Sequence, residues 1–128
     1  VNIALIEDQK PICGVVYAPL TGTLYYAMAG KGAFKVAPGC QPVRINTHDD
    51  NGGVFAPAAD TASKALMMCR LAEGMPGIDQ ALYHCMEWQS AAAHAVARAA
   101  GKRVRPCNCN DELTYNKMDW SSECVTVS

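Results

Sequence analysis

The chain has 128 residues, of which half are apolar and 18% are charged, and its formal net charge is −1. This composition predicts one folded globular domain and argues against a disordered chain. Such a small net charge gives no field that would attract nucleic acid, and no apolar run is long enough to span a membrane. We therefore expect neither a nucleic-acid partner nor a membrane partner.

Seven cysteines are present, an odd number, and no two of them are spaced as Cys-x-x-Cys. Residues 1–7 carry neither the basic region nor the cleavage site of a signal peptide. Both observations favour reduced thiols over a disulfide framework, so we expect a cytoplasmic location.

The first 36 residues contain short runs of β-forming residues separated by turns of glycine, proline and aspartate. Strands that are joined by such short turns pair with their neighbours in antiparallel fashion. The sequence therefore predicts an antiparallel meander whose strands cover residues 1–7, 12–18, 23–28 and 33–36.

The remainder predicts a loop over 37–57, with a short strand at 43–45, and then a helix and strand part over 58–128. Asp60 or Thr61 is the expected cap of a first helix that ends near Glu73, and Gly101 follows a second helix over 87–100. Further strands are expected at 78–83, 102–105 and 124–127. We therefore expect a single domain over 1–128 of the layered α/β class, with a meander, two helices and a small second sheet.

Several sequence segments occur in a recognisable order along nearly the whole chain. They are 1–8, 14–19, 24–27, 30–33, 71–74, Trp88 with Ala91–Ala92 and His94–Val96, 99–101 and 113–117. Together they resemble the inositol monophosphatase superfamily, most closely its 3'(2'),5'-bisphosphate nucleotidase branch, and the resemblance implies the C-terminal part of that fold.

Enzymes of this superfamily hydrolyse phosphomonoesters with Mg²⁺, so the resemblance implies magnesium as a cofactor. The family takes its carboxylate ligands from three places, and two of them precede the segment that this chain matches. The third is an aspartate directly after the helical tryptophan, where this chain has Gln89 after Trp88. A neutral amide is a poor ligand for magnesium, so we expect the metal ligands to be largely absent.

Gln89 and Ser90 lie in the first turn of the second helix, where free N–H groups favour an anion. Lys117 would meet the same phosphate if the family layout is kept. Alternatively, Gln89 and Ser90 are simply the polar first turn of a helix that binds no anion, and Lys117 is an ordinary surface lysine. Glu87 could replace the missing aspartate, but two helical positions separate it from Gln89, so the two side chains point about 200° apart.

Cys107 and Cys109 form a Cys-x-Cys pair that could bind a soft metal ion, although two ligands do not complete a site. His84 and Cys85 are adjacent, and neighbours in a strand point to opposite faces, which argues against a catalytic Cys-His pair. His94 lies off the apolar stripe of its helix, so we expect it to be solvated.

Three functional hypotheses stay open from the sequence. The chain is a reduced phosphatase-like hydrolase, a module that binds a phosphorylated ligand or nucleotide without hydrolysis, or a thiol-rich metal-binding or stress-tolerance protein. Because the family fold has a further half, we also expect apolar strand faces to be uncovered, and therefore a homodimer or larger homo-oligomer.

Overall fold

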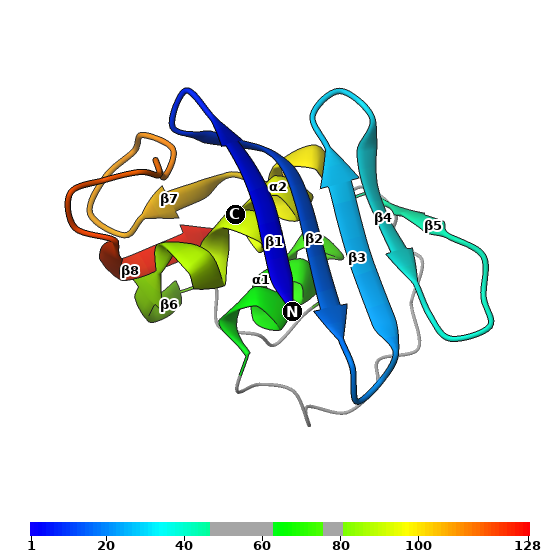
Figure 1. The fold of residues 1–128 in the computed structure, drawn as a ribbon. Helices are drawn as coiled ribbons and strands as arrows, with labels where there is room; N and C mark the ends of the chain where they lie inside the picture. Colours follow the sequence, from blue (N-terminus) through cyan, green and yellow to red (C-terminus); the bar gives the residue numbers. More distant parts are fainter. Residues whose placement is uncertain (47–62, 76–80) are drawn as a thin grey trace.

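The computed structural model describes residues 1–46, 63–75 and 81–128 of the chain (Figure 1). Its larger sheet is an antiparallel meander in the order β1-β2-β3-β4-β5, as the sequence predicted. The bounds of its strands are Asn2–Glu7 for β1, Lys10–Ala18 for β2, Thr23–Met28 for β3, Gly32–Val36 for β4 and Val43–Ile45 for β5.

The first hairpin is tighter than the sequence indicated. Asp8 and Gln9 both adopt positive φ angles, of 47° and 62°. Two consecutive residues in this conformation make a two-residue turn that suits antiparallel strands. Glu7 consequently pairs with Lys10, and β2 begins two residues earlier than expected.

Two helices lie on one side of this sheet, α1 over Lys64–Ala72 and α2 over Glu87–Ala99 (Figure 1). The Ser63 side chain caps α1 by accepting a hydrogen bond from the Leu66 N–H, at 3.4 Å. The caps expected at Asp60 or Thr61 lie outside the described residues, as do the first three residues of the strand expected at 78–83.

A second, three-stranded sheet has the order β6-β8-β7, which confirms the small second sheet. Its strands are β6 over Ala81–Met86, β7 over Val104–Pro106 and β8 over Ser121–Val127. The structure thus has the layered α/β architecture that was predicted. None of the helices in the described residues is long and apolar enough to cross a bilayer.

The main core lies between the large sheet and α2, which presents a buried face made mostly of alanine. This face allows a close approach to β2, because a Cβ atom built on Gly14 would lie 2.3 Å from the Ala92 carbonyl oxygen and 2.8 Å from the Ala95 Cβ. Glycine at position 14 is therefore required for the helix to lie this close to the strand.

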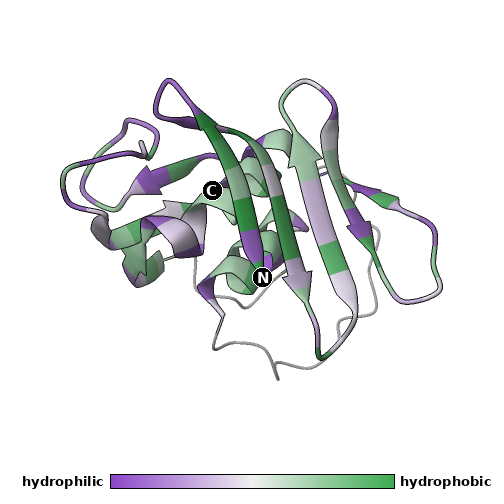
Figure 2. Cartoon of the chain, viewed as in Figure 1, coloured by the Kyte–Doolittle hydropathy of each residue, from purple (hydrophilic) through white to green (hydrophobic). Residues whose placement is uncertain are grey.

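No helix of the described residues covers the opposite face of the large sheet, and Figure 2 colours β1 and β2 largely as hydrophobic residues. Ile3, Leu5, Tyr17 and Met28 are exposed there, and Tyr26 stacks on Phe34 with 5.3 Å between ring centroids. Both helices of the described residues pack on the other side. We call this surface the outer face; its members are Ile3, Leu5, Cys13, Val15, Tyr17, Leu24, Tyr26, Met28, Phe34 and Val36.

Candidate functional site

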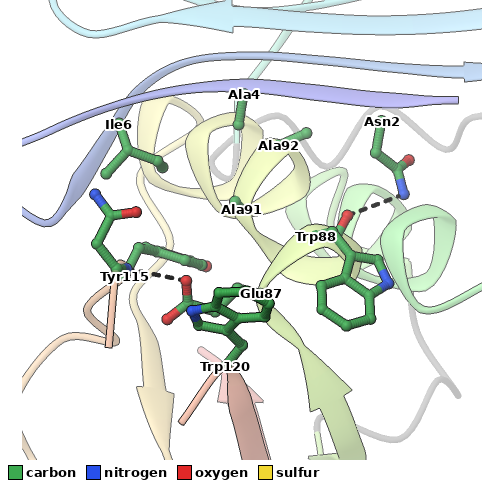
Figure 3. A pocket seen from close by; sticks show the side chains of 10 residues that line it. Asn2, Ala4, Ile6, Glu87, Trp88, Ala91, Ala92, Tyr115 and Trp120 are labelled. Carbon is green, nitrogen blue, oxygen red and sulfur yellow. Dashed lines mark hydrogen bonds between the residues drawn. The ribbon is translucent and has the colours of Figure 1, made fainter. Parts of the chain in front are cut away.

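A cavity of about 370 Å³ lies between β1 and the first half of α2 (Figure 3). Alanine side chains form much of its apolar lining, and three aromatic side chains lie around it. Its described polar side chains include two asparagines and one glutamate. The lining residues are Asn2, Ala4, Ile6, Glu87, Trp88, Ala91, Ala92, Tyr115, Asn116 and Trp120.

The alternation of β1 supplies one wall of this pocket. Asn2, Ala4 and Ile6 share one face of the strand, whereas Ile3 and Leu5 belong to the outer face. The Asn2 side-chain amide donates a hydrogen bond to the Trp88 carbonyl oxygen at 3.4 Å, which ties the strand to the start of α2 (Figure 3).

The facing wall comes from the segment between β7 and β8, and Glu87 holds it in place. Its carboxylate accepts hydrogen bonds from the backbone N–H groups of Asn116, at 2.9 Å, and Lys117, at 3.1 Å. The Glu87 N–H donates to the Trp120 carbonyl oxygen at 2.8 Å. Glu87 therefore anchors the pocket wall, because each of its two oxygens accepts one backbone N–H from this segment.

A buried polar network lies behind the pocket and contains His94, which is fully buried. The expectation that His94 is solvated was wrong. Its Nδ1 lies 3.0 Å from the Tyr115 hydroxyl, and its Nε2 lies 3.0 Å from Glu112 Oε1. The Tyr115 hydroxyl also lies 3.4 Å from Ser90 Oγ, so these four side chains link α2 to the pocket wall.

Burial determines the protonation of this network. Loss of hydration lowers the pKa of His94 below its usual range, although the hydrogen bond to Glu112 and its charge oppose the shift. Burial also raises the pKa of the Tyr115 hydroxyl. Near neutral pH the network therefore contains a neutral imidazole and a protonated phenol.

Trp88 and Trp120 give the pocket its binding character. Their side chains are exposed at 59% and 60%, although both line the cavity. Exposed indole rings offer flat apolar surfaces on which a ring-shaped ligand can stack, and an indole N–H is a further hydrogen-bond donor. The arrangement can thus bind a small ligand that has both a flat part and polar substituents.

The three predicted phosphate contacts lie beside the pocket, but none of them lines it. Gln89 Oε1 accepts the Met86 N–H at 3.0 Å, and Ser90 is buried with its hydroxyl 3.3 Å from the Met86 carbonyl oxygen. The Lys117 ammonium donates to Ser122 Oγ at 3.0 Å. Contact of Gln89, Ser90 or Lys117 with a ligand therefore stays a prediction.

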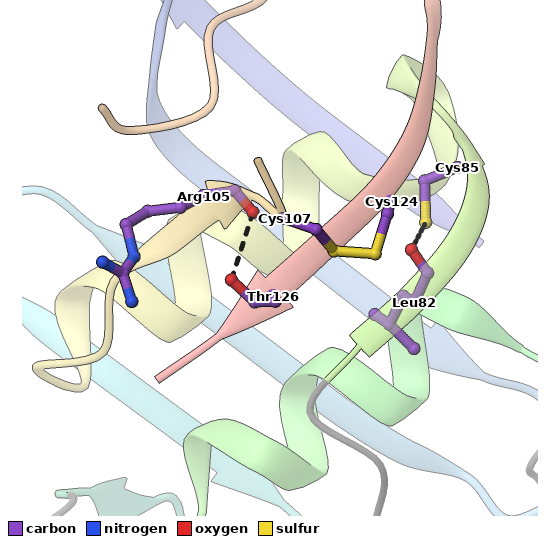
Figure 4. Close-up of a disulfide and its surroundings, with 6 residues drawn as sticks. All are labelled: Leu82, Cys85, Arg105, Cys107, Cys124 and Thr126. Carbon is purple, nitrogen blue, oxygen red and sulfur yellow. Dashed lines mark hydrogen bonds between the residues drawn. A yellow bond between two sulfur atoms is a disulfide. The ribbon is translucent and has the colours of Figure 1, made fainter. Parts of the chain in front are cut away.

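The cysteines differ from the sequence-based expectation. Cys107 and Cys124 form a disulfide, with 5.3 Å between their Cα atoms (Figure 4). The expectation of seven reduced thiols was therefore wrong for these two, and the other five cysteines are free. A disulfide sulfur carries no thiolate charge, so Cys107 and Cys109 cannot act as the proposed soft-metal pair while the bond is present.

The described residues do not fit the magnesium that the resemblance implies. Within residues 1–46, 63–75 and 81–128 there is no group of three or more His, Cys, Asp or Glu side chains that could hold a metal ion. Gln89 and Glu87, the two candidates near Trp88, use their oxygens for backbone N–H groups. Magnesium requires several free oxygen ligands, and this part of the chain does not bring them together.

Sequence reasoning missed most of the pocket. Tyr115, Asn116 and Trp120 lie in a segment without helix or strand, where no periodic pattern marks a buried side chain. The one available signal was Asn2, a polar residue on the face of β1 that otherwise carries Ala4 and Ile6. A polar side chain in such a position calls for a partner across the core.

Residues 1–54 match the model of the inositol monophosphatase family. The 3'(2'),5'-bisphosphate nucleotidase CysQ of Salmonella typhimurium is 33% identical over 121 residues, which are 81% of this chain and 49% of that protein. The protein of the same name from Escherichia coli K12 is 35% identical over 123 residues, with the same two shares. The chain thus spans about half the length of these curated relatives.

The fold agrees with these relationships. CysQ from Bacteroides thetaiotaomicron, described as a bacterial member of the inositol monophosphatase family, superposes with a TM-score of 0.78. The two chains are 26% identical, and the match covers 99% of this chain and 61% of the other. Sequence and structure therefore point to the same group of proteins.

Proposed function

Because this chain is related to the inositol monophosphatase family, we propose that its pocket binds a small phosphorylated ligand, such as a nucleotide, without hydrolysing it by a magnesium-dependent mechanism of its own. The observation that carries the proposal is the pocket itself. It lies at the start of α2, next to Gln89, and Glu87, the one carboxylate among the described lining residues, accepts the N–H groups of Asn116 and Lys117.

The lining supports a ligand with a flat ring. Trp88 and Trp120 provide exposed aromatic surfaces, and Asn2 and Asn116 provide amides that can both donate and accept hydrogen bonds. Pockets of about 300 Å³ or more are large enough for small organic ligands. The Lys117 ammonium lies 3.8 Å from Glu87 Oε1 and offsets the charge of that carboxylate. The N–H groups at the start of α2 then favour the negative charge of a phosphate.

The proposal is tested by calorimetry of the 128-residue chain with adenosine 3',5'-bisphosphate and, separately, with inositol 1-phosphate. We expect saturable heat with at least one of them, and weaker binding for Trp88→Ala. The matched control is Met118→Ala, which removes a fully exposed side chain outside the pocket. Absence of heat for both ligands, or equal weakening by the control, would reject the proposal.

A second assay separates binding from hydrolysis. Release of inorganic phosphate from the same two compounds is measured with Mg²⁺ and with a chelator, and we expect the same background rate in both. Release that increases with Mg²⁺ would favour the alternative of a reduced phosphatase-like hydrolase. The third hypothesis, a thiol-rich metal-binding protein, has no support from the described residues while Cys107 is bonded to Cys124.

We also propose a cytoplasmic location. Disulfides in mesophilic cytoplasmic proteins are in general transient and respond to redox conditions, so the Cys107–Cys124 bond would be reversible there. Cell fractionation with a tagged chain tests the location, and recovery from outside the cytoplasm would contradict it.

A further inference from the structure

We propose that the Cys107–Cys124 disulfide is a redox-sensitive clasp on the pocket, whose reduction loosens the pocket wall and weakens ligand binding. The effect on a ligand rests on the function proposed above, whereas the effect on the wall does not. The bond joins the turn after β7 to β8, across 17 positions of sequence (Figure 4).

The segment that the disulfide closes is also the segment that forms one pocket wall. Tyr115, Asn116 and Trp120 all lie between the two cysteines, and all three line the cavity. Residues 107–120 contain neither helix nor strand. At the ends of this segment the Cys107 N–H donates to the Cys124 carbonyl oxygen at 3.0 Å, beside the last pair of the β7–β8 ladder. Between these ends the position of the segment depends on individual contacts and on the covalent link.

The individual contacts are spread along the segment, and they add to the buried network of Tyr115 and Glu112 with His94 and to the Glu87 hydrogen bond with Trp120. The Leu113 N–H donates to the Val104 carbonyl oxygen at 2.9 Å, and the Tyr115 N–H donates to the Gln9 carbonyl oxygen at 3.0 Å. The Glu87 carboxylate accepts hydrogen bonds from the N–H groups of the next two residues, Asn116 and Lys117. Because these contacts persist when the disulfide is reduced, the domain stays folded. Loss of the covalent link then increases the mobility of the pocket wall.

The disulfide is placed where a reductant can reach it. Cys107 is exposed, whereas Cys124 is half-buried in β8. A thiolate of a dithiol such as dithiothreitol attacks the Cys107 sulfur, the bond to Cys124 breaks, and Cys124 leaves as a thiolate that takes up a proton. The second thiol of the reagent then displaces Cys107, which also becomes a thiol, and the reagent ends as a cyclic disulfide.

Hydrogen–deuterium exchange tests the clasp without any ligand. The oxidised chain is compared with the same chain in dithiothreitol, and we expect the amides of Tyr115, Asn116 and Lys117 to exchange about tenfold faster after reduction. The amides of β2 and β3 should not change. Equal exchange at 115–117 in the two states would overturn the proposal.

Matched cysteine variants identify which sulfur atoms cause the faster amide exchange after reduction. The double variant Cys107→Ser with Cys124→Ser should exchange like the reduced chain and should not respond to dithiothreitol. Cys109→Ser removes an exposed free thiol from the same turn and should respond like the original chain. A Cys109→Ser chain that no longer responds would assign the effect to another thiol and reject the clasp.

Calorimetry then connects the clasp to binding. Adenosine 3',5'-bisphosphate should bind about tenfold more weakly to the reduced chain, because a mobile wall must be ordered when the ligand binds. Equal affinities in both states would overturn the regulatory proposal. If no heat is measured in either state, the proposed function fails, and the exchange experiment alone decides whether the clasp exists.

Discussion

The Nδ1 atom of the buried His94 lies 3.0 Å from the hydroxyl oxygen of Tyr115. On the other side of the ring, Nε2 meets Glu112, whose carboxylate also lies 3.7 Å from Arg98 Nε. One imidazole therefore joins α2 to the segment that forms the pocket wall. A neutral ring satisfies both contacts by donating through one nitrogen and accepting through the other.

The stability of the domain should fall as the pH is lowered through the range in which unfolded histidine takes up a proton. Burial holds the pKa of His94 below its usual range, so the unfolded chain binds more protons than the folded chain just below about pH 6.5. Unfolding is favoured there, by at most about 1.4 kcal/mol per pH unit from this group. Above this range both states carry a neutral ring and the dependence ends.

Urea denaturation between about pH 7.5 and pH 5.5 measures this dependence. The variant His94→Asn cannot titrate in this range and should show a smaller slope of unfolding free energy against pH. If the slope is the same in the original chain and in His94→Asn, the pH dependence of stability does not come from His94.

A second prediction concerns the contact between the large sheet and α1. The Tyr25 hydroxyl donates to Glu73 Oε1 at 2.5 Å, and Lys35 Nζ lies 2.8 Å from Glu73 Oε2. Tyr25→Phe removes the hydroxyl from a buried position and should lower the free energy of unfolding by about 1–3 kcal/mol. Tyr83→Phe, at an exposed position of β6, should change it by less than about 0.5 kcal/mol. Chemical denaturation measures the free energy of unfolding of both variants. Equal effects would show that the hydrogen bond from Tyr25 to Glu73 does not stabilise the contact between the sheet and α1.

A third prediction concerns Glu87, whose side chain is only 14% exposed. Glu87→Ala leaves the N–H groups of Asn116 and Lys117 without their acceptor, so unfolding should become easier by about 1–3 kcal/mol. Glu123→Ala, at an exposed position, is the matched control. Denaturant midpoints give the measurement, and a Glu87→Ala midpoint equal to that of the control would show that the segment is held by other contacts.

We further propose that a second copy of the chain covers the outer face. Taking roughly 200 Å² for each large side chain when fully exposed, Ile3, Leu5, Tyr17 and Met28 leave about 400 Å² open. The half-buried members extend this patch, and a stable interface buries roughly 800 Å² per partner. In a twofold dimer the same patch of each copy packs against the other, and two apolar patches can do so without complementary charges.

Light scattering at increasing concentration should therefore give twice the mass of the chain. Leu5→Lys places a charge on the outer face and should give the mass of one chain, whereas Leu20→Lys, at an exposed turn, should not. Labelling of the original chain gives a second measurement that needs no variant: Cys13, on the outer face, should react more slowly as the dimer forms, and the exposed Cys40 should not. A single-chain mass at about 100 μM, or equal labelling, would reject the dimer.

Local chemistry made much of the large sheet predictable. β3 has the bounds that the sequence predicted, because Thr23–Met28 is a run of β-forming residues between two glycine-containing turns. The end of α2 was also placed within one residue by Gly101. These elements depend on residues that are close together in sequence.

The site could not be predicted in the same way, because its contacts join residues that are distant in sequence. His94 looked solvated from its own helix, and the residues that bury it, Glu112 and Tyr115, follow 18 and 21 positions later. The partner of Cys107 was equally hidden, since cysteine spacing alone does not define connectivity. Such pairings become visible only when the chain is folded.

The close approach of Gly14 to Ala92 and Ala95 has a consequence for protein engineering. The seam between β2 and α2 has no spare volume, so a library that randomises position 14 alone should return glycine among its folded members. Larger residues would be accepted only together with a shift of the helix backbone, because the obstacle at 2.3 Å is a carbonyl oxygen that no change of side chain removes.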